Sequence, residues 1–89
     1  MNIELMLIGK PGCHLCDDAR VVIDQVISQF RQENPAAEIS YVEQNILEDE
    51  ELLRIHHDEI PVLKINGLVH NFWKIDPERF RAALEKLVS

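Results

Sequence analysis

GKPGCHLCDD, residues 9–18, holds both cysteines of the 89-residue chain, Cys13 and Cys16, at a C-x-x-C spacing. The segment follows an apolar run at residues 3–8 (IELMLI), which is typical of a short strand buried on both faces. From residue 14 to residue 32, apolar side chains recur at steps of three and four, which predicts a helix with one buried stripe. Cys13 is therefore expected at a strand-to-helix junction, at the N-terminus of the helix.

The rest of the chain predicts three more strands and two more helices. These elements are a strand, a short helix, two strands and a last helix, at residues 38–43, 47–57, 61–65, 68–72 and 77–88. Asn66-Gly67 joins the last two strands and is a pair typical of a tight type I′ hairpin turn. Asp76 precedes Pro77 as the expected N-cap of the last helix. The order β-α-β-α-β-β-α predicts an α/β fold in which three helices flank a four-stranded mixed sheet.

The length and composition predict a single globular domain over residues 1–89. Hydrophobic residues make up 46% of the chain and charged residues 28%, as in proteins that bury a compact core. The formal net charge is −7 and the basic residues are scattered, so we expect no binding to nucleic acid or to an anionic membrane. The first residues contain neither a basic leader nor the ~20 apolar residues of a membrane span. We therefore expect a cytoplasmic protein.

The two cysteines carry the chemistry that the sequence predicts. In a reducing cytosol, a close cysteine pair favours catalysis or metal binding over a permanent crosslink. The thiolate is the nucleophile in disulfide exchange, and the charge at a helix start lowers a cysteine pKa. Cys13 is the candidate nucleophile, and Cys16, one turn later, is the candidate resolving thiol. Lys10 would favour the Cys13 thiolate, whereas Asp17 and Asp18 would oppose it.

Three segments together resemble a known family. The first strand, the segment KPGCHLCDDA and the later run Ile60-Pro61-Val62-Leu63 resemble the thioredoxin fold, and more narrowly the glutaredoxin-like proteins with a C-x-x-C site. The resemblance covers nearly the whole chain and implies a thiol-disulfide oxidoreductase in which Cys13 attacks and Cys16 resolves. It also implies a cis peptide bond at Ile60-Pro61 that faces the active site, with the backbone of Ile60 pairing with the substrate.

The resemblance also indicates the partners of the reaction. The expected substrate is a disulfide-bearing protein or a low-molecular-weight thiol compound, contacted by Ile60, Pro61, Lys10 and His14. The reductant would be a thiol such as glutathione, or a thioredoxin-reductase-type system, and the protein would act as a monomer with no bound cofactor or metal. Glutaredoxins that bind glutathione usually have a Gly-Gly pair and an acidic residue after the fourth strand. Residues 70–74 of this chain read HNFWK instead, so the pattern does not predict a glutathione site.

Two alternatives remain open at this stage. A C-x-x-C pair is also half of a zinc or iron-sulfur site, but the only further soft ligands are four histidines without a ligand spacing: His14, His56, His57 and His70. A metal or cluster carrier would therefore need ligands from glutathione or a second subunit. The other alternative is an interaction module without redox activity.

Phe72 and Trp73, at the end of the last predicted strand, are expected to close the core. His56 and His57 are expected to end a helix.

Overall fold

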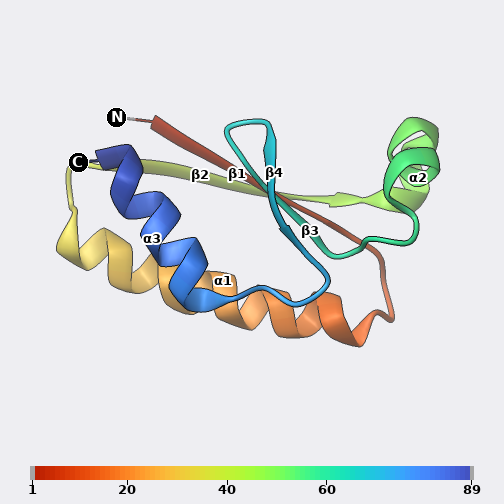
Figure 1. Cartoon of the computed structure of the whole chain (residues 1–89), viewed down its shortest axis with the longest axis horizontal. Helices are drawn as coiled ribbons and strands as arrows, with labels where there is room; N and C mark the ends of the chain where they lie inside the picture. Colours follow the sequence, from red (N-terminus) through yellow and green to blue (C-terminus); the bar gives the residue numbers. More distant parts are fainter. Residues whose placement is uncertain (1, 89) are drawn as a thin grey trace.

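The computed structural model describes residues 2–88 and contains a four-stranded mixed sheet with three α-helices (Figure 1). The elements are β1 (Asn2–Gly9), α1 (His14–Glu33), β2 (Glu38–Asn45), the short 3-10 helix η1 (Ile46–Glu48), α2 (Glu50–His56), β3 (Val62–Ile65), β4 (Leu68–Phe72) and α3 (Pro77–Val88). The strand order is β2-β1-β3-β4, with β1 parallel to β2 and β3 antiparallel to both of its neighbours. The predicted order of elements is confirmed.

The core lies between one face of the sheet and two helices. α1 and α3 run along the same face, which is the lower one in Figure 1. Their apolar stripes meet the inward side chains of β1 and β3. The largest fully buried members of this cluster are Phe30, Phe80, Ile3, Leu5, Leu7, Ile23, Leu63 and Leu84. Since the stripe of α1 begins directly after Cys16, packing of the core fixes the position of the cysteine pair.

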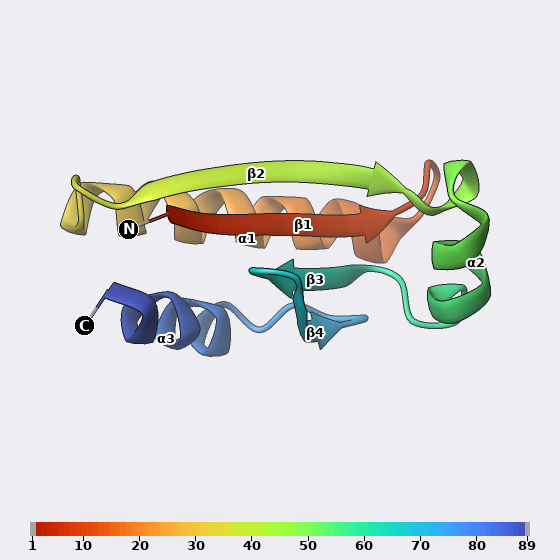
Figure 2. The same cartoon turned by 90° about the horizontal axis from the view of Figure 1, so that it is seen from above.

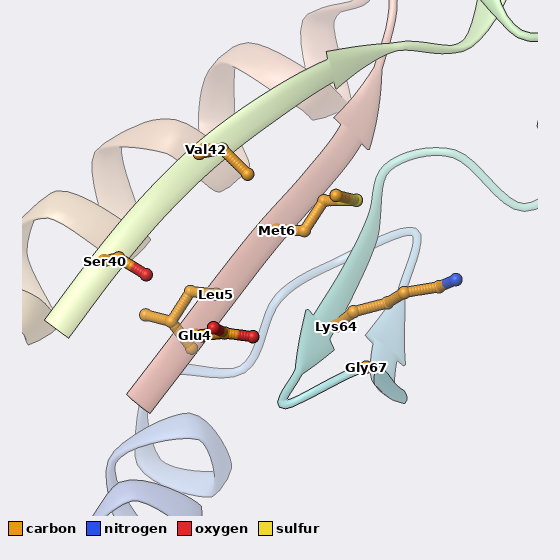
Figure 3. Close-up of a pocket in the computed structure, with 7 residues that line it drawn as sticks. All are labelled: Glu4, Leu5, Met6, Ser40, Val42, Lys64 and Gly67. Atoms are coloured by element: carbon orange, nitrogen blue, oxygen red, sulfur yellow. The ribbon is translucent and has the colours of Figure 1, made fainter. Parts of the chain in front are cut away.

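The opposite face of the sheet is largely open. α2 lies at the end of the sheet, beyond the tips of β1 and β2 (Figure 2). It therefore covers only the small buried cluster of Ile8, Ile46 and Val62 and leaves the rest of this face open. The expectation that the first strand is buried on both faces is therefore wrong for Glu4, which is exposed. Side chains of β1, β2 and β3 line a shallow groove of about 370 Å³ here (Figure 3).

Local conformation and hydrogen bonds set one turn and two helix starts. Asn66 and Gly67 have φ angles of 51° and 83°, which confirms a turn that needs two left-handed residues. Asp76 accepts hydrogen bonds from the backbone N–H groups of Glu78 and Arg79 and so begins α3. The short helix expected at residues 47–57 is divided, because the Asp49 carboxylate accepts from two backbone N–H groups and starts α2 at Glu50.

His70 is a titratable group placed against the core. Its ring lies 6.2 Å from that of Phe80, centroid to centroid, and its Nε2 atom is buried without a hydrogen-bond partner among the described residues. Burial, and to a smaller extent the charge of Arg79, lowers the pKa of His70 below its ordinary value of 6.5. The fold therefore favours the neutral imidazole.

This lowered pKa predicts a pH-dependent stability. Below pH 6.5, the unfolded chain binds a proton at residue 70 more readily than the folded chain does, so the free energy of unfolding falls as the pH drops through the folded pKa. His70→Phe keeps an aromatic ring beside Phe80 and removes the titration. Urea unfolding at neutral and mildly acidic pH should show a smaller loss of stability in the variant. An equal loss in both proteins would contradict the prediction.

Candidate active site

Cys13 and Cys16 form a disulfide bond at the N-terminus of α1, with their Cα atoms 5.2 Å apart. Gly12 has a φ of 75°, a conformation that glycine adopts without strain and that turns the chain into the helix. Cys13 is the N-cap residue, and its Sγ accepts a hydrogen bond of 3.2 Å from the backbone N–H of Cys16. The predicted position of Cys13 at a strand-to-helix junction is confirmed.

The two sulfur-bearing residues differ in their access to solvent. Cys16 is fully buried, with an exposed fraction of 0%, whereas Cys13 is half-buried. A reagent from solution therefore meets Cys13 before Cys16. The N–H groups of the first turn point toward the N-terminus of α1, where negative charge on a cysteine sulfur is stabilised.

The end of β1 packs directly on the buried sulfur. A Cβ atom added to Gly9 would lie 2.9 Å from the Sγ atom of Cys16, which is closer than carbon and sulfur tolerate. β1 and β3 pair Ile8 with Val62, and one further step in this register places Pro61 opposite Gly9. The Ile60-Pro61 peptide bond is cis, as the resemblance implies. The structure thus brings the cis-proline segment to the cysteine pair.

Lys10 and His14 flank the cysteines but are exposed. Lys10 lies in the loop before Cys13 and lines a groove of about 340 Å³ together with Arg20 and Glu43. Within residues 2–88, neither Lys10 nor His14 forms a hydrogen bond or an ion pair. Both side chains are free to contact a molecule that approaches Cys13.

The sequence interpretation missed a pair of ionic contacts made by Arg20. The Arg20 guanidinium donates to the Asp17 carboxylate through Nη1 and to the Glu43 carboxylate through Nε. The hydrogen bond that Arg20 donates to Glu43 is the largest cause that raises the pKa of Arg20, and Asp17 acts in the same direction. The i, i+3 spacing of Asp17 and Arg20 is a signal in the sequence that could have indicated the first contact.

Phe72 and Trp73 do not close the core, so that expectation is wrong. Trp73 is 54% exposed and its ring meets the Phe72 ring edge-on, with centroids 5.0 Å apart. The indole Nε1 donates to the Asp58 carbonyl at 2.8 Å, and the Trp73 backbone N–H donates to the Pro61 carbonyl at 2.9 Å. Trp73 also has a φ of 64°, which is rare for a bulky residue. The two hydrogen bonds of Trp73 hold the segment that leads to the cis bond in place.

A small groove runs beside the cysteine pair. It has a volume of about 230 Å³ and lies between the first turns of α1 and the segment after β4, with Leu15, Asp18 and Lys74 among its lining residues. Leu15, between the two cysteines, is 45% exposed. An apolar side chain next to Cys13 is therefore available for contact.

The histidines do not assemble with the cysteines into a metal site. His56 is buried at the end of α2 with its Nδ1 atom 3.2 Å from Glu59 Oε1, and His57 Nδ1 lies 3.1 Å from the Leu53 carbonyl. Both end a helix, as expected. Within residues 2–88, no three His, Cys, Asp or Glu side chains are grouped so that they could hold a metal ion. Zinc or a cluster at Cys13 and Cys16 would need ligands from another molecule.

None of the helices in the described part of the chain combines the length and the apolar character that a membrane span needs.

Comparison with known proteins gives one family and several solved structures of similar fold. A family model described as Glutaredoxin-like domain (DUF836) matches residues 4–85. A solved X. campestris protein, structural genomics target XcR50, is 26% identical with a TM-score of 0.71, and the match covers 92% of this chain and 96% of that one. Protein Ne2328 from Nitrosomonas europaea is 24% identical with a TM-score of 0.60, covering 91% and 89%. None of the curated proteins compared with the chain matches it.

The fold also matches that of a thioredoxin. The oxidised thioredoxin from Plasmodium falciparum is 11% identical with a TM-score of 0.63, and the match covers 98% of this chain and 82% of the thioredoxin. At this identity the likeness concerns the fold alone. The α/β thioredoxin fold predicted from the sequence is confirmed.

Proposed function

Because the chain belongs to the glutaredoxin-like domain family, we propose that it is a small thiol-disulfide oxidoreductase that uses Cys13 and Cys16. The observation that carries the proposal is the unequal access of the two bonded cysteines. Cys13 is half-buried at a helix N-terminus, and Cys16 is fully buried one turn away. In this arrangement a substrate can reach the Cys13 sulfur, and the Cys16 sulfur lies close enough to attack Cys13 in the next step.

The reaction passes one electron pair from the dithiol to the substrate disulfide. The Cys13 thiolate attacks one sulfur of the substrate, the substrate S–S bond breaks, and its other sulfur leaves as a thiolate that takes up a proton. The Cys16 thiol loses its proton and attacks Cys13 Sγ in the resulting mixed disulfide. The second substrate thiolate leaves and is protonated, and the Cys13–Cys16 disulfide forms. Two thiol equivalents of an external reductant then restore the dithiol.

The proposed substrates are disulfide-bearing proteins or low-molecular-weight disulfides in the cytoplasm. Glutathione or a thioredoxin-reductase-type system would return the electrons to a monomeric protein. The two thiols hold the electron pair themselves, so the chemistry needs no bound cofactor. The candidate substrate contacts are the exposed Lys10, His14 and Leu15 and the backbone of Ile60 at the cis bond.

A redox titration of the protein tests the proposal. Purified protein is equilibrated in glutathione buffers of graded potential, its thiols are trapped by alkylation, and the alkylated sites are counted by mass spectrometry. We expect a reversible two-electron transition between the dithiol and the Cys13–Cys16 disulfide, within the range of roughly −270 to −120 mV covered by such proteins. Thiols that stay reduced throughout would contradict it. Zinc or iron bound stoichiometrically by the purified protein would favour a carrier instead.

A further inference from the structure

Asp17 and Arg20 lie one above the other on α1, close to its N-cap residue Cys13. The two residues are spaced at i and i+3 and so share a helix face, and they follow Cys13 by four and seven positions. Side chains on a helix lean toward its N-terminus. The Arg20 guanidinium therefore reaches back over the preceding turn, where it meets the Asp17 carboxylate.

The guanidinium is held from two directions. Its Nη1 atom donates to Asp17 on α1, and its Nε atom donates to Glu43 on β2. The three side chains are exposed by 37% for Arg20, 64% for Asp17 and 43% for Glu43, so water screens their charges only in part. The contact with Glu43 holds the guanidinium between α1 and β2, near the helix start.

Asp17 alone would act against the chemistry proposed for Cys13. A carboxylate one turn from a developing thiolate repels it, which disfavours the reactive form. A cation bonded to that carboxylate cancels most of its field at the sulfur. At this exposure the ion pair itself contributes little to stability.

We propose that Arg20, held by Glu43, is a positioning residue that neutralises Asp17 and thereby favours the thiolate form of Cys13. This inference rests on the proposed function, since it concerns the nucleophile of that reaction. Arg20 touches neither sulfur and acts through Asp17. The other charged or titratable side chains near the helix start are Lys10, His14, Asp18 and, from the segment after β4, Lys74, and they stay unchanged in every variant below.

The experiment measures the Cys13 pKa in a Cys16→Ser background, where Cys13 is the single thiol. The rate of alkylation by iodoacetamide is followed against pH. We expect Arg20→Gln to raise the Cys13 pKa by roughly half a unit, because charges about two helical turns apart interact weakly through partly exposed surroundings. Asp17→Asn should lower the pKa by a similar amount. The double variant should return close to the starting value, since both charges are then gone.

Two further variants separate charge from structure. Arg20→Lys keeps the cation and should restore most of the original pKa. Arg81→Gln removes a comparable surface ion pair, between Arg81 on α3 and Glu33 at the far end of α1, and should leave the Cys13 pKa unchanged. The shift caused by Arg20→Gln should shrink at high salt, because ions screen exposed charges.

The outcomes are distinct from those that test the proposed function. An unchanged Cys13 pKa in Arg20→Gln would overturn the inference, as would an equal rise in Arg20→Gln and in the double variant, because the effect would then be structural. If the unmodified protein exchanges no disulfides while the pKa shifts appear as expected, the proposed function fails and the electrostatic coupling stands. If exchange is observed and the shifts are missing, only the inference fails.

Discussion

Replacing Cys13 with serine is expected to reduce disulfide exchange to the uncatalysed background, whereas replacing Cys16 with serine is expected to stop the reaction halfway. A serine hydroxyl does not replace a thiolate as a nucleophile toward sulfur, so the first variant cannot form the mixed disulfide. In the second variant Cys13 still attacks, but the buried resolving thiol is missing. One half of the substrate disulfide should remain attached to Cys13.

The measurement combines turnover with mass spectrometry. A thiol-reporting disulfide such as a dithiobis-nitrobenzoate is mixed with each reduced variant, and the intact mass of the protein is recorded under non-reducing conditions. Cys13→Ser should show neither turnover nor an adduct, and Cys16→Ser should show a stable adduct of one substrate half. A stable adduct on Cys16 in the Cys13→Ser protein would contradict the assigned order of the two thiols.

Replacing Gly9 with alanine is expected to destabilise the folded protein by about 1–3 kcal/mol, the usual cost of overpacking a core. The added Cβ would lie 2.9 Å from Cys16 Sγ, and Cys16 is fully buried. The sulfur is fixed in the disulfide form, whereas the thiol of the reduced form can change its rotamer. The variant should therefore lose more stability when oxidised and should have a more positive reduction potential.

Chemical denaturation of both redox forms and a redox titration measure these two effects. The matched control is Gly9→Ala in a Cys16→Ala protein, in which the clashing sulfur is absent and only a Cβ contact of 3.3 Å remains. There the same substitution should cost clearly less, as a double-mutant cycle for residues in contact requires. An equal cost in the two backgrounds would show that the contact with Sγ is not the cause.

The features that could be predicted from the sequence depend on local signals. The helix start at Cys13, the turn at Asn66-Gly67 and the cap at Asp76 each involve residues within a few positions of one another. The stripe of apolar residues in α1 likewise repeats at short range. Such patterns fix an element and its buried side without any knowledge of what lies opposite.

The features that could not be predicted depend on residues far apart in the chain. Arg20 meets Glu43 across 23 positions, and the Trp73 indole meets the Asp58 carbonyl across 15. The open face of the sheet also depends on distant residues. The apolar run in β1 is typical of a strand covered on both faces, but α2 lies beyond the strand tips and leaves one face open. The divided helix after β2 is a local miss, because Asp49 lies inside the predicted helix and is the N-cap of α2.

Trp73 is the one tryptophan of the sequence, and its position gives the protein an optical consequence. The Trp73 side chain is about half exposed to solvent and contacts Phe72. Its indole donates a hydrogen bond to the segment that leads to the cis-proline bond. Intrinsic fluorescence excited at the indole therefore originates from a single place beside the cis-proline segment. Emission wavelength and quenching become label-free reporters of this segment, readable in real time during a stopped-flow reaction.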